Sequence, residues 1–159
     1  MEFGMREMAE AEWREFVLSG TRTGKLATNR KDGRPHVTPV WFLLDDSDGD
    51  GDSHGAGGGQ VRVVFTTYQD SLKFKSLSRE PRFSLCVDDQ EPPFSYVMLE
   101  CTAEFTDEPE SVRRWATRIG GRYMGAENAE AYGKRNSVPG EYLVRARIDR
   151  VVAFAGIAE

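Results

Sequence analysis

Residues 61–87 read VRVVFTTYQDSLKFKSLSREPRFSLCV, and this stretch determines the fold class. The apolar, β-branched run over 61–67 predicts a strand. Leu72 and Leu77, spaced among basic residues, predict a short helix over 69–79 that ends before Pro81. Residues 82–88 then alternate apolar and polar side chains, which is typical of a strand with one buried face. The chain therefore combines strands and helices in close succession.

The sequence on either side adds further elements. Asp32-Gly33 lies between two apolar runs and is a strong hairpin signal, so we expect strands over 22–28 and 34–44. The helix that starts near 109 is expected to have Asp107 as its N-cap. The remaining expected elements are helices over 7–19, 109–120 and, more weakly, 126–134, and strands over 94–105 and 141–154. About six mostly antiparallel strands with three helices predict an α+β fold whose sheet forms a closed or nearly closed barrel.

The composition excludes several classes of protein. A chain of 159 residues suits one domain, so we expect a single domain over 1–159. Its longest apolar run, at 40–44, is far shorter than the ~20 residues of a membrane helix, and its first residues lack the apolar stretch of a signal peptide. Cys86 and Cys101 are too few for a disulfide scaffold, and we interpret both as small core residues. We therefore expect a cytoplasmic protein without a bound metal.

The negative charge is concentrated in one segment. The formal net charge is −5, but residues 45–60, DDSDGDGDSHGAGGGQ, contain five Asp and no Lys or Arg, so the rest of the chain is electrically neutral. This balance argues against a nucleic-acid partner. The start of the segment resembles a calcium loop, but Gly57 stands where that loop needs a bidentate Glu. We interpret residues 45–60 as a flexible, Asp/Gly-rich hairpin insertion.

The turn after the strand at 61–67 combines residues that suit an anion. Thr66 and Thr67 end the strand, and Ser71 and Lys73 stand at the start of the next helix. Backbone N–H groups at a helix start carry partial positive charge, so a hydroxyl and an ammonium there can complete a phosphate pocket. We interpret Asp70 as an N-cap that points away from the anion. The alternative is an ordinary solvated basic helix face. The sequence contains no nucleophile elbow, Walker-type loop or dinucleotide glycine motif, so the catalytic residues stay unknown.

Three stretches resemble, in order and spacing, the flavin-binding split-barrel family named for pyridoxamine phosphate oxidase. They are GKLATNRKDGRPHVTPVWFLL at 24–44, VVFTTYQDSLKFKSLSREPRFSLCVDD at 63–89 and MLECTAEF at 98–105. The resemblance implies a homodimer of six-stranded antiparallel split barrels with peripheral helices. It also implies a flavin in each of two clefts between the subunits, with a small-molecule substrate and no membrane partner.

Two further stretches resemble the actinobacterial branch of this family that uses the deazaflavin coenzyme F420. They are LATNRKDGRPHVTPVWFLL at 26–44 and ATRIGGRYMGAENAEAYGKRN at 116–136. The FMN oxidases of the family have basic residues at the positions of Thr38, Leu43 and Leu72. Without an arginine at Leu72, a fork-shaped phosphate contact is lost. The resemblance therefore implies F420 as the cofactor, with FMN as the alternative.

The resemblance also assigns roles to individual residues. Thr66, Thr67, Ser71 and Lys73 would hold the cofactor phosphate, with Lys75 in support. The full set of cofactor-binding candidates is Thr38, Pro39, Val40, Trp41, Thr66, Thr67, Ser71, Lys73 and Lys75. Pro39, Val40 and Trp41 would line the ring, although Trp41 could equally serve core packing. Candidates to contact the cofactor tail are Lys25, Arg30, Lys31 and Arg34, and candidates to close the pocket from the partner subunit are Tyr123, Met124, Tyr132 and Asn136.

The sequence thus predicts an F420-dependent oxidoreductase. It would transfer a hydride between the reduced deazaflavin and a small unsaturated or conjugated substrate. One alternative is an FMN-binding oxidase or reductase of the same fold. Another is a non-catalytic cofactor- or pigment-binding protein, because the sequence identifies no proton donor.

Overall fold

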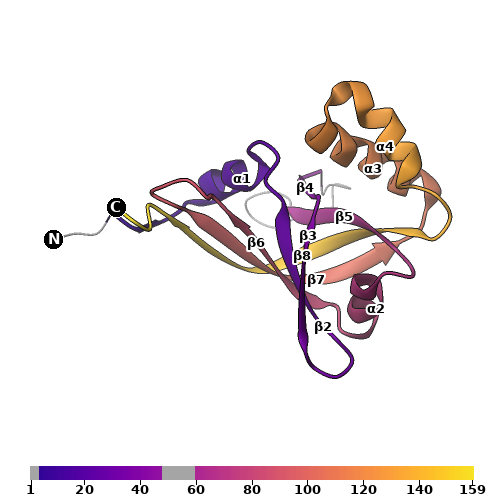
Figure 1. The fold of residues 1–159 in the computed structure, drawn as a ribbon, viewed down its shortest axis with the longest axis horizontal. Coiled ribbons are helices and arrows are strands. Elements are labelled where there is room, and N and C mark those ends of the chain that lie inside the picture. The colour runs from indigo at the N-terminus through magenta and orange to yellow at the C-terminus, as the bar shows by residue number, and fades with distance from the viewer. Residues whose placement is uncertain (1–3, 48–59) are drawn as a thin grey trace.

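Eight strands form one antiparallel sheet in a computed structural model that describes residues 4–47 and 60–159 (Figure 1). The strands are β1 (Arg6–Glu7), β2 (Gly24–Asn29), β3 (Pro35–Val40), β4 (Leu43–Asp45), β5 (Arg62–Tyr68), β6 (Arg82–Asp88), β7 (Tyr96–Thr106) and β8 (Glu141–Ala155). Their hydrogen-bonded order is β3-β2-β6-β7-β8-β5-β4, and β1 pairs with the end of β8. The long strands β7 and β8 form the centre of this order, with a bulge after Glu100.

Four α-helices accompany the sheet. They are α1 (Glu10–Leu18), α2 (Leu72–Arg79), α3 (Pro109–Met124) and α4 (Ala129–Arg135), and a short 3₁₀ turn at Ala126–Asn128 joins the last two. Helices α3 and α4 form a hairpin at one side of the sheet (Figure 1). Val112 and Trp115 of α3 pack with Val64 of β5 and Leu143 of β8, which fixes the hairpin over these two strands. No helix in the described ranges combines the length and apolar character needed to cross a bilayer.

The two edges of the sheet are consecutive in the chain. β3 lies at one end of the strand order and β4 at the other, yet only Trp41 and Phe42 separate them. Three trans peptide units span at most about 11 Å, so the sheet must curl until its two edges come together. The result is a barrel that is split between β3 and β4.

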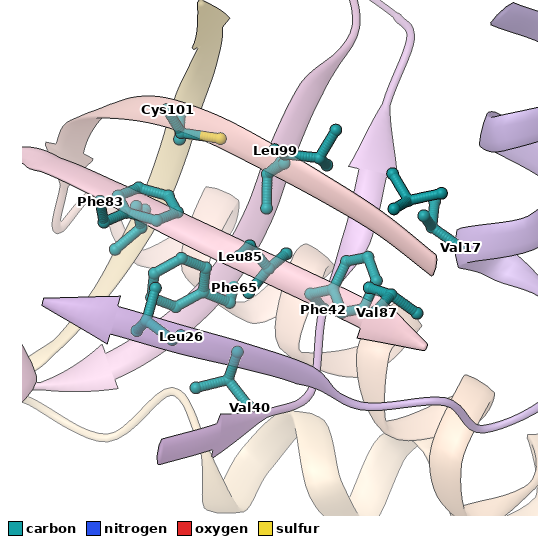
Figure 2. Packing of buried hydrophobic residues seen from close by; sticks show 14 of the residues in the cluster. Val17, Leu26, Val40, Phe42, Phe65, Phe83, Leu85, Val87, Leu99 and Cys101 are labelled. Atoms are coloured by element: carbon teal, nitrogen blue, oxygen red, sulfur yellow. The ribbon is translucent and has the colours of Figure 1, made fainter. Parts of the chain in front are cut away.

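Apolar side chains fill the interior of this barrel. Leu26 of β2 and Phe83 and Leu85 of β6 point toward Phe65 of β5 across the interior, and each alternates with residues that face outward (Figure 2). Phe42 is fully buried and continues the same cluster at the link between the two edges. Because each such side chain stabilises the fold by about 1.5–3 kcal/mol, the core holds the curled sheet in place.

The α+β class and the antiparallel sheet are confirmed, but the predicted number of strands is wrong and the sheet is not fully closed. The sheet has eight strands, not six, and the described strand order has two unjoined ends. The predicted strand over 34–44 is divided into β3 and β4, because a continuous strand could not pair with β2 at one edge and β5 at the other. The weaker helical segment at 126–134 becomes the 3₁₀ turn followed by α4.

The predicted cap of α3 is also corrected. Glu108, not Asp107, is the N-cap, because its carboxylate accepts hydrogen bonds from the N–H groups of Glu110 (3.1 Å) and Ser111 (2.8 Å). Pro109 then occupies the first helical position, where a missing N–H costs nothing. Most of the predicted insertion at 45–60, namely residues 48–59, lies outside the described residues.

Candidate functional site

A cavity of about 350 Å³ brings together seven of the nine residues predicted to bind a cofactor. It lies between β5, the end of β3 and the inner side of α3. The lining residues are Pro39, Val40, Trp41, Thr66, Thr67, Tyr68, Ser71, Lys73, Ala116, Ile119, Asn136 and Glu141. Residues far apart in the chain therefore meet at one place.

Strand alternation on β5 determines how its two threonines reach the cavity. Val63 and Phe65 belong to the barrel core, whereas Val64 packs with α3. Since successive side chains of a strand point to opposite faces, Thr66 lies on the α3 side and Thr67 on the barrel side. Thr67 is 3% exposed and lies where its hydroxyl meets the turn that follows.

Ser71 is the N-cap of α2, which corrects the prediction that Asp70 plays this role. The Ser71 hydroxyl accepts a hydrogen bond from the N–H of Phe74 (3.1 Å), and it lies 2.9 Å from the Thr67 hydroxyl. Only one hydroxyl proton can occupy the bond between Ser71 and Thr67. The pair therefore keeps one proton that can be donated to a ligand.

The start of α2 offers further donors. The N–H groups of Leu72 and Lys73 have no hydrogen-bond partner within the described part of the chain, as expected for the first turn of a helix. The Lys73 ammonium adds a full positive charge at the same end of the cavity. Two N–H groups, a hydroxyl and an ammonium, with the helix dipole behind them, suit an anion such as a phosphate.

Aromatic packing fixes α2 in this position. The ring of Phe74 lies 4.6 Å from that of Tyr142 on β8 and 5.4 Å from that of Phe105 on β7. Contacts of this kind add about 0.5–1.5 kcal/mol each beyond the area that they bury. The donors of the first turn are therefore held by the sheet itself.

Glu141 is a site residue that the sequence did not identify. It is the first residue of β8 and lies opposite Tyr68 in the sheet, so the β5–β8 register brings it beside the end of the cavity that holds Ser71 and Lys73. Burial raises the pKa of Glu141 above its ordinary value, and the Lys73 ammonium partly offsets that rise. Its carboxyl partly neutralises Lys73 and, when ionised, opposes a bound anion.

Trp41 forms a wall of the cavity and is held in place by aromatic residues of α3 and α4. Its ring is stacked on Tyr123 of α3 at 5.0 Å, with 6° between the planes, and lies 5.7 Å from the ring of Tyr132 of α4. The Tyr123 hydroxyl donates to the carbonyl of Arg22 (2.8 Å) and accepts from the N–H of Phe42 (3.3 Å). Within this chain Tyr123 and Tyr132 contact Trp41 and Asn136 lines the cavity, while their role in closing a partner's pocket stays a prediction.

Arg122 attaches the α3–α4 hairpin to the barrel. Its guanidinium donates to the carbonyl oxygens of Val17 (2.7 Å), Phe42 (2.7 Å) and Gly20 (3.0 Å). It also lies over the rings of Phe42 and Tyr123, at 4.9 and 4.8 Å from their centroids. Burial lowers the pKa of Arg122, but an arginine remains charged at neutral pH. This attachment sets the distance between α3 and the strand residues of the cavity.

Two predicted site residues lie outside the lining. Thr38 is opposite Leu26 of β2, on the face of β3 that also carries Val40. Lys75 is exposed on α2 and does not line the cavity. Of the basic residues considered for a cofactor tail, Lys25 is paired with Asp88 at 2.9 Å.

The donor set fits a phosphate-bearing aromatic cofactor. One end of the cavity presents mainly N–H, hydroxyl and ammonium groups, while Pro39, Trp41, Ala116 and Ile119 give the remainder apolar walls. Small-molecule sites usually measure about 300–1,000 Å³, so this cavity is at the small end of that range. It can hold part of such a cofactor within one chain.

Comparisons with known proteins identify structures that share this fold. A conserved hypothetical protein from Mycobacterium tuberculosis is 28% identical, with a TM-score of 0.74 over 94% of this chain and 86% of its own. A protein described as an F420 reductase is 20% identical, with a TM-score of 0.59 over 86% of this chain and 94% of its own. An FAD-binding protein from Mesorhizobium loti is 16% identical, with a TM-score of 0.64 over 94% and 95% of the two chains.

The last two structures are 20% and 16% identical to this chain, so they show a shared fold only. The family assignment rests on a match between the sequence and a family model. Residues 9–153 match the family model described as pyridoxamine 5'-phosphate oxidase, which includes every residue of the cavity. The chain belongs to the pyridoxamine 5'-phosphate oxidase family.

Proposed function

We propose that this protein is an F420-dependent oxidoreductase. It would transfer a hydride between the reduced deazaflavin and a small unsaturated or conjugated substrate. The cofactor phosphate would bind at the Ser71 and Lys73 end of the cavity, with the ring along Pro39, Val40 and Trp41. The observation that carries the proposal is the meeting of the unpartnered α2 N–H groups, the Thr67–Ser71 hydroxyl pair and Lys73 at one end of a largely apolar cavity.

Residue identities favour F420 over FMN as the cofactor. The positions at which FMN oxidases of this family have basic residues are occupied here by Thr38, Leu43 and Leu72. Leu72 is 43% exposed at the start of α2, so this position supplies only a backbone donor to a phosphate. The fold likeness to an F420 reductase is in keeping with this choice, although at 20% identity it concerns the fold alone.

The chain's own residues would bind and orient the cofactor and exclude water. A bound reduced deazaflavin supplies the hydride, while the protein determines what the ring faces. Trp41 is immobilised by Tyr123, so it offers a fixed surface for the ring. Ala116 and Ile119 of α3 are buried and keep the opposite wall apolar. The proton that balances hydride transfer would come from solvent or from the substrate side, because Glu141 lies at the anion-binding end.

We also propose that the cofactor cleft is completed by a second copy of the chain. The cavity within one chain is small, and Tyr68 and Leu72 at its edge are 38% and 43% exposed. The outward face of β3 is apolar next to the site, with Val37 62% exposed between Pro35 and Pro39. These prolines lack N–H groups, so the contact would use the face of β3 rather than extend the sheet. Sedimentation analysis checks this, since a monomer at micromolar concentration would contradict it.

Titration of the purified protein with F420 and with FMN tests the cofactor assignment. Lys73→Ala is expected to weaken binding by about 1.5–3 kcal/mol, or roughly 10- to 150-fold, because a charge-assisted phosphate contact is lost. Lys75→Ala is the matched control: it removes the same charge from the same helix but lies outside the cavity. An unchanged dissociation constant in Lys73→Ala, or equal losses in both variants, would count against the site.

Turnover then separates the three functions. Oxidation of reduced F420 by an activated alkene or quinone, dependent on this protein, is expected. Tight binding of FMN with no response to F420 would favour the FMN-dependent alternative. Binding of either cofactor with no turnover on any acceptor would favour a cofactor- or pigment-binding protein.

A further inference from the structure

A second hollow lies on the other side of α3 from the candidate cofactor cavity. It measures about 610 Å³ and is lined mainly by polar side chains from α3, β8, β4 and the end of β7. Ser111, Arg114, Trp115 and Arg118 line it from one stripe of α3, since residues three and four apart share a helix face. Arg145 of β8 lines it from the sheet. We call this hollow the arginine pocket.

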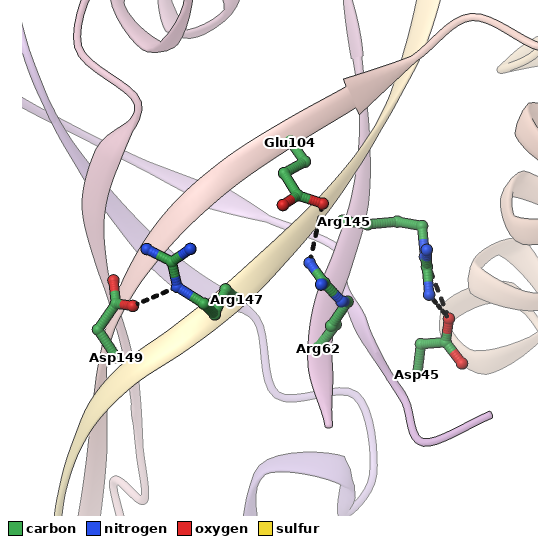
Figure 3. A network of polar contacts seen from close by, with 6 residues as sticks. All are labelled: Asp45, Arg62, Glu104, Arg145, Arg147 and Asp149. Carbon is green, nitrogen blue, oxygen red and sulfur yellow. Dashed lines mark hydrogen bonds and ion pairs between the residues drawn. The ribbon is translucent and has the colours of Figure 1, made fainter. Parts of the chain in front are cut away.

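One of its three arginines is already neutralised. Arg145 donates two hydrogen bonds to the Asp45 carboxylate, at 2.7 and 3.2 Å from its Nη2 and Nε atoms (Figure 3). Burial raises the pKa of Asp45, but hydrogen bonds from Ser47 and Arg145 outweigh this and hold it below its ordinary value. Asp45 is 3% exposed, and these hydrogen bonds keep it ionised as a fixed partner of Arg145.

The other two arginines keep their charge. Within the described ranges, no carboxylate forms an ion pair with Arg114 or Arg118. Glu108 is near Arg114, but both of its carboxylate oxygens accept hydrogen bonds from the first turn of α3. The Arg118 guanidinium lies 4.8 Å from the centroid of the Trp115 ring. Trp115 is only 5% exposed, so its ring holds the guanidinium in one position through a cation–π contact.

This charge arrangement costs stability unless an anion is bound. Like charges four residues apart on a helix are destabilising, and Arg114 and Arg118 are spaced in this way. Arginine also presents its donors in a planar fork that matches carboxylate and phosphate oxygens. The Thr106 hydroxyl in the lining can donate to the same oxygens.

We propose that the arginine pocket binds a small molecule that carries two or more carboxylate or phosphate groups. This site is separate from the cofactor cavity, which α3 lines with Ala116 and Ile119 instead. The inference does not depend on the proposed redox function, because none of the residues that carry it lines that cavity.

Calorimetric titration of the protein with citrate and with pyrophosphate, at constant ionic strength, tests the proposal. We expect one site per chain, and the preferred probe tells whether carboxylates or phosphates are recognised. The double variant Arg114→Gln/Arg118→Gln is expected to lower the affinity at least about tenfold. The control Arg113→Gln/Lys134→Gln removes the same net charge at exposed positions outside the pocket and is expected to change the affinity less than about twofold.

Several outcomes would overturn the proposal. One is that wild type binds neither probe at millimolar concentration, and another is that both double variants lose affinity equally. Loss of binding in Lys73→Ala would place the probe in the cofactor cavity instead. Binding that emerges only after Asp48, Asp50 and Asp52 are changed to Asn would show that carboxylates of the chain itself neutralise the arginines.

Discussion

Substitution of Ser71 separates its two roles, capping of α2 and binding of an anion. Its hydroxyl accepts from the N–H of Phe74 at 3.1 Å and pairs with Thr67 at 2.9 Å. Ser71→Ala removes the cap acceptor, which costs about 0.5–2 kcal/mol of stability and therefore lowers the Tm by several degrees. Ser71→Asp keeps a good cap acceptor, so it is expected to melt close to wild type.

The same two variants should rank in the opposite order for binding. In Ser71→Ala the freed Thr67 hydroxyl can still donate to the anion, so the affinity falls by about tenfold at most. In Ser71→Asp a carboxylate would replace the hydroxyl at the proposed anion site, and two like charges about 5 Å apart repel each other. At an effective dielectric constant of about 20 this repulsion is roughly 3 kcal/mol per unit charge, or at least two orders of magnitude in affinity.

The assay is thermal denaturation without ligand, followed by F420 titration of each folded variant. Ser71→Asn is the neutral control, since it keeps a cap acceptor without adding charge and should stay within about tenfold of wild type. The reasoning is refuted if Ser71→Asp binds the cofactor as tightly as Ser71→Ala. It is also refuted if Ser71→Asp melts as low as Ser71→Ala, because the cap would then not explain the stability.

Three further predictions concern groups around the barrel. A bound anion raises the already elevated pKa of Glu141 further, so the wild-type affinity for the anion should fall as pH rises from about 5 to 8. Ligand titrations across this range should show a flatter pH profile and tighter binding in Glu141→Gln than in wild type. Arg122→Met leaves buried carbonyls without donors and should lower the unfolding free energy by about 3 kcal/mol, whereas the exposed control Arg113→Met should change it by less than about 0.5 kcal/mol in denaturant unfolding. Burial raises the pKa of Cys101 to about 12, so an aromatic disulfide reagent near pH 8 should modify at most Cys86 before unfolding; fast reaction of two thiols in the folded protein would contradict this.

The grouping of donors at the proposed anion-binding end could be predicted from the sequence because it is local. Thr67, Ser71 and Lys73 follow one another across a strand end, a turn and a helix start, and such a sequence places hydroxyl and N–H donors together whatever the rest of the fold does. The choice of cap was wrong for a local reason as well. Asp70 and Ser71 are both good N-cap residues, and the register of the first helical turn decides between them.

The remaining walls of the cavity could not be predicted because they depend on contacts between distant segments. Glu141 reaches the site only through its pairing with Tyr68, and no local pattern fixes the register between β5 and β8. The division of the strand at Trp41 and Phe42 has the same origin. A run that is apolar on both faces indicates that the chain crosses the core, but not that it leaves one sheet edge for the other at that residue.

The two ends of the cavity therefore differ in what can change them. The anion-binding end is built from consecutive residues whose donors are set by the start of α2, and Phe74 holds that start against β7 and β8. The opposite wall belongs to the α3–α4 hairpin, which the guanidinium of Arg122 and the stack of Trp41 on Tyr123 attach to the barrel. Substitutions in the hairpin can reshape the space beside the proposed ring site without altering a single donor at the proposed phosphate site. We therefore expect cofactor affinity to follow α2 and substrate preference to follow the hairpin, because each depends on a different set of contacts.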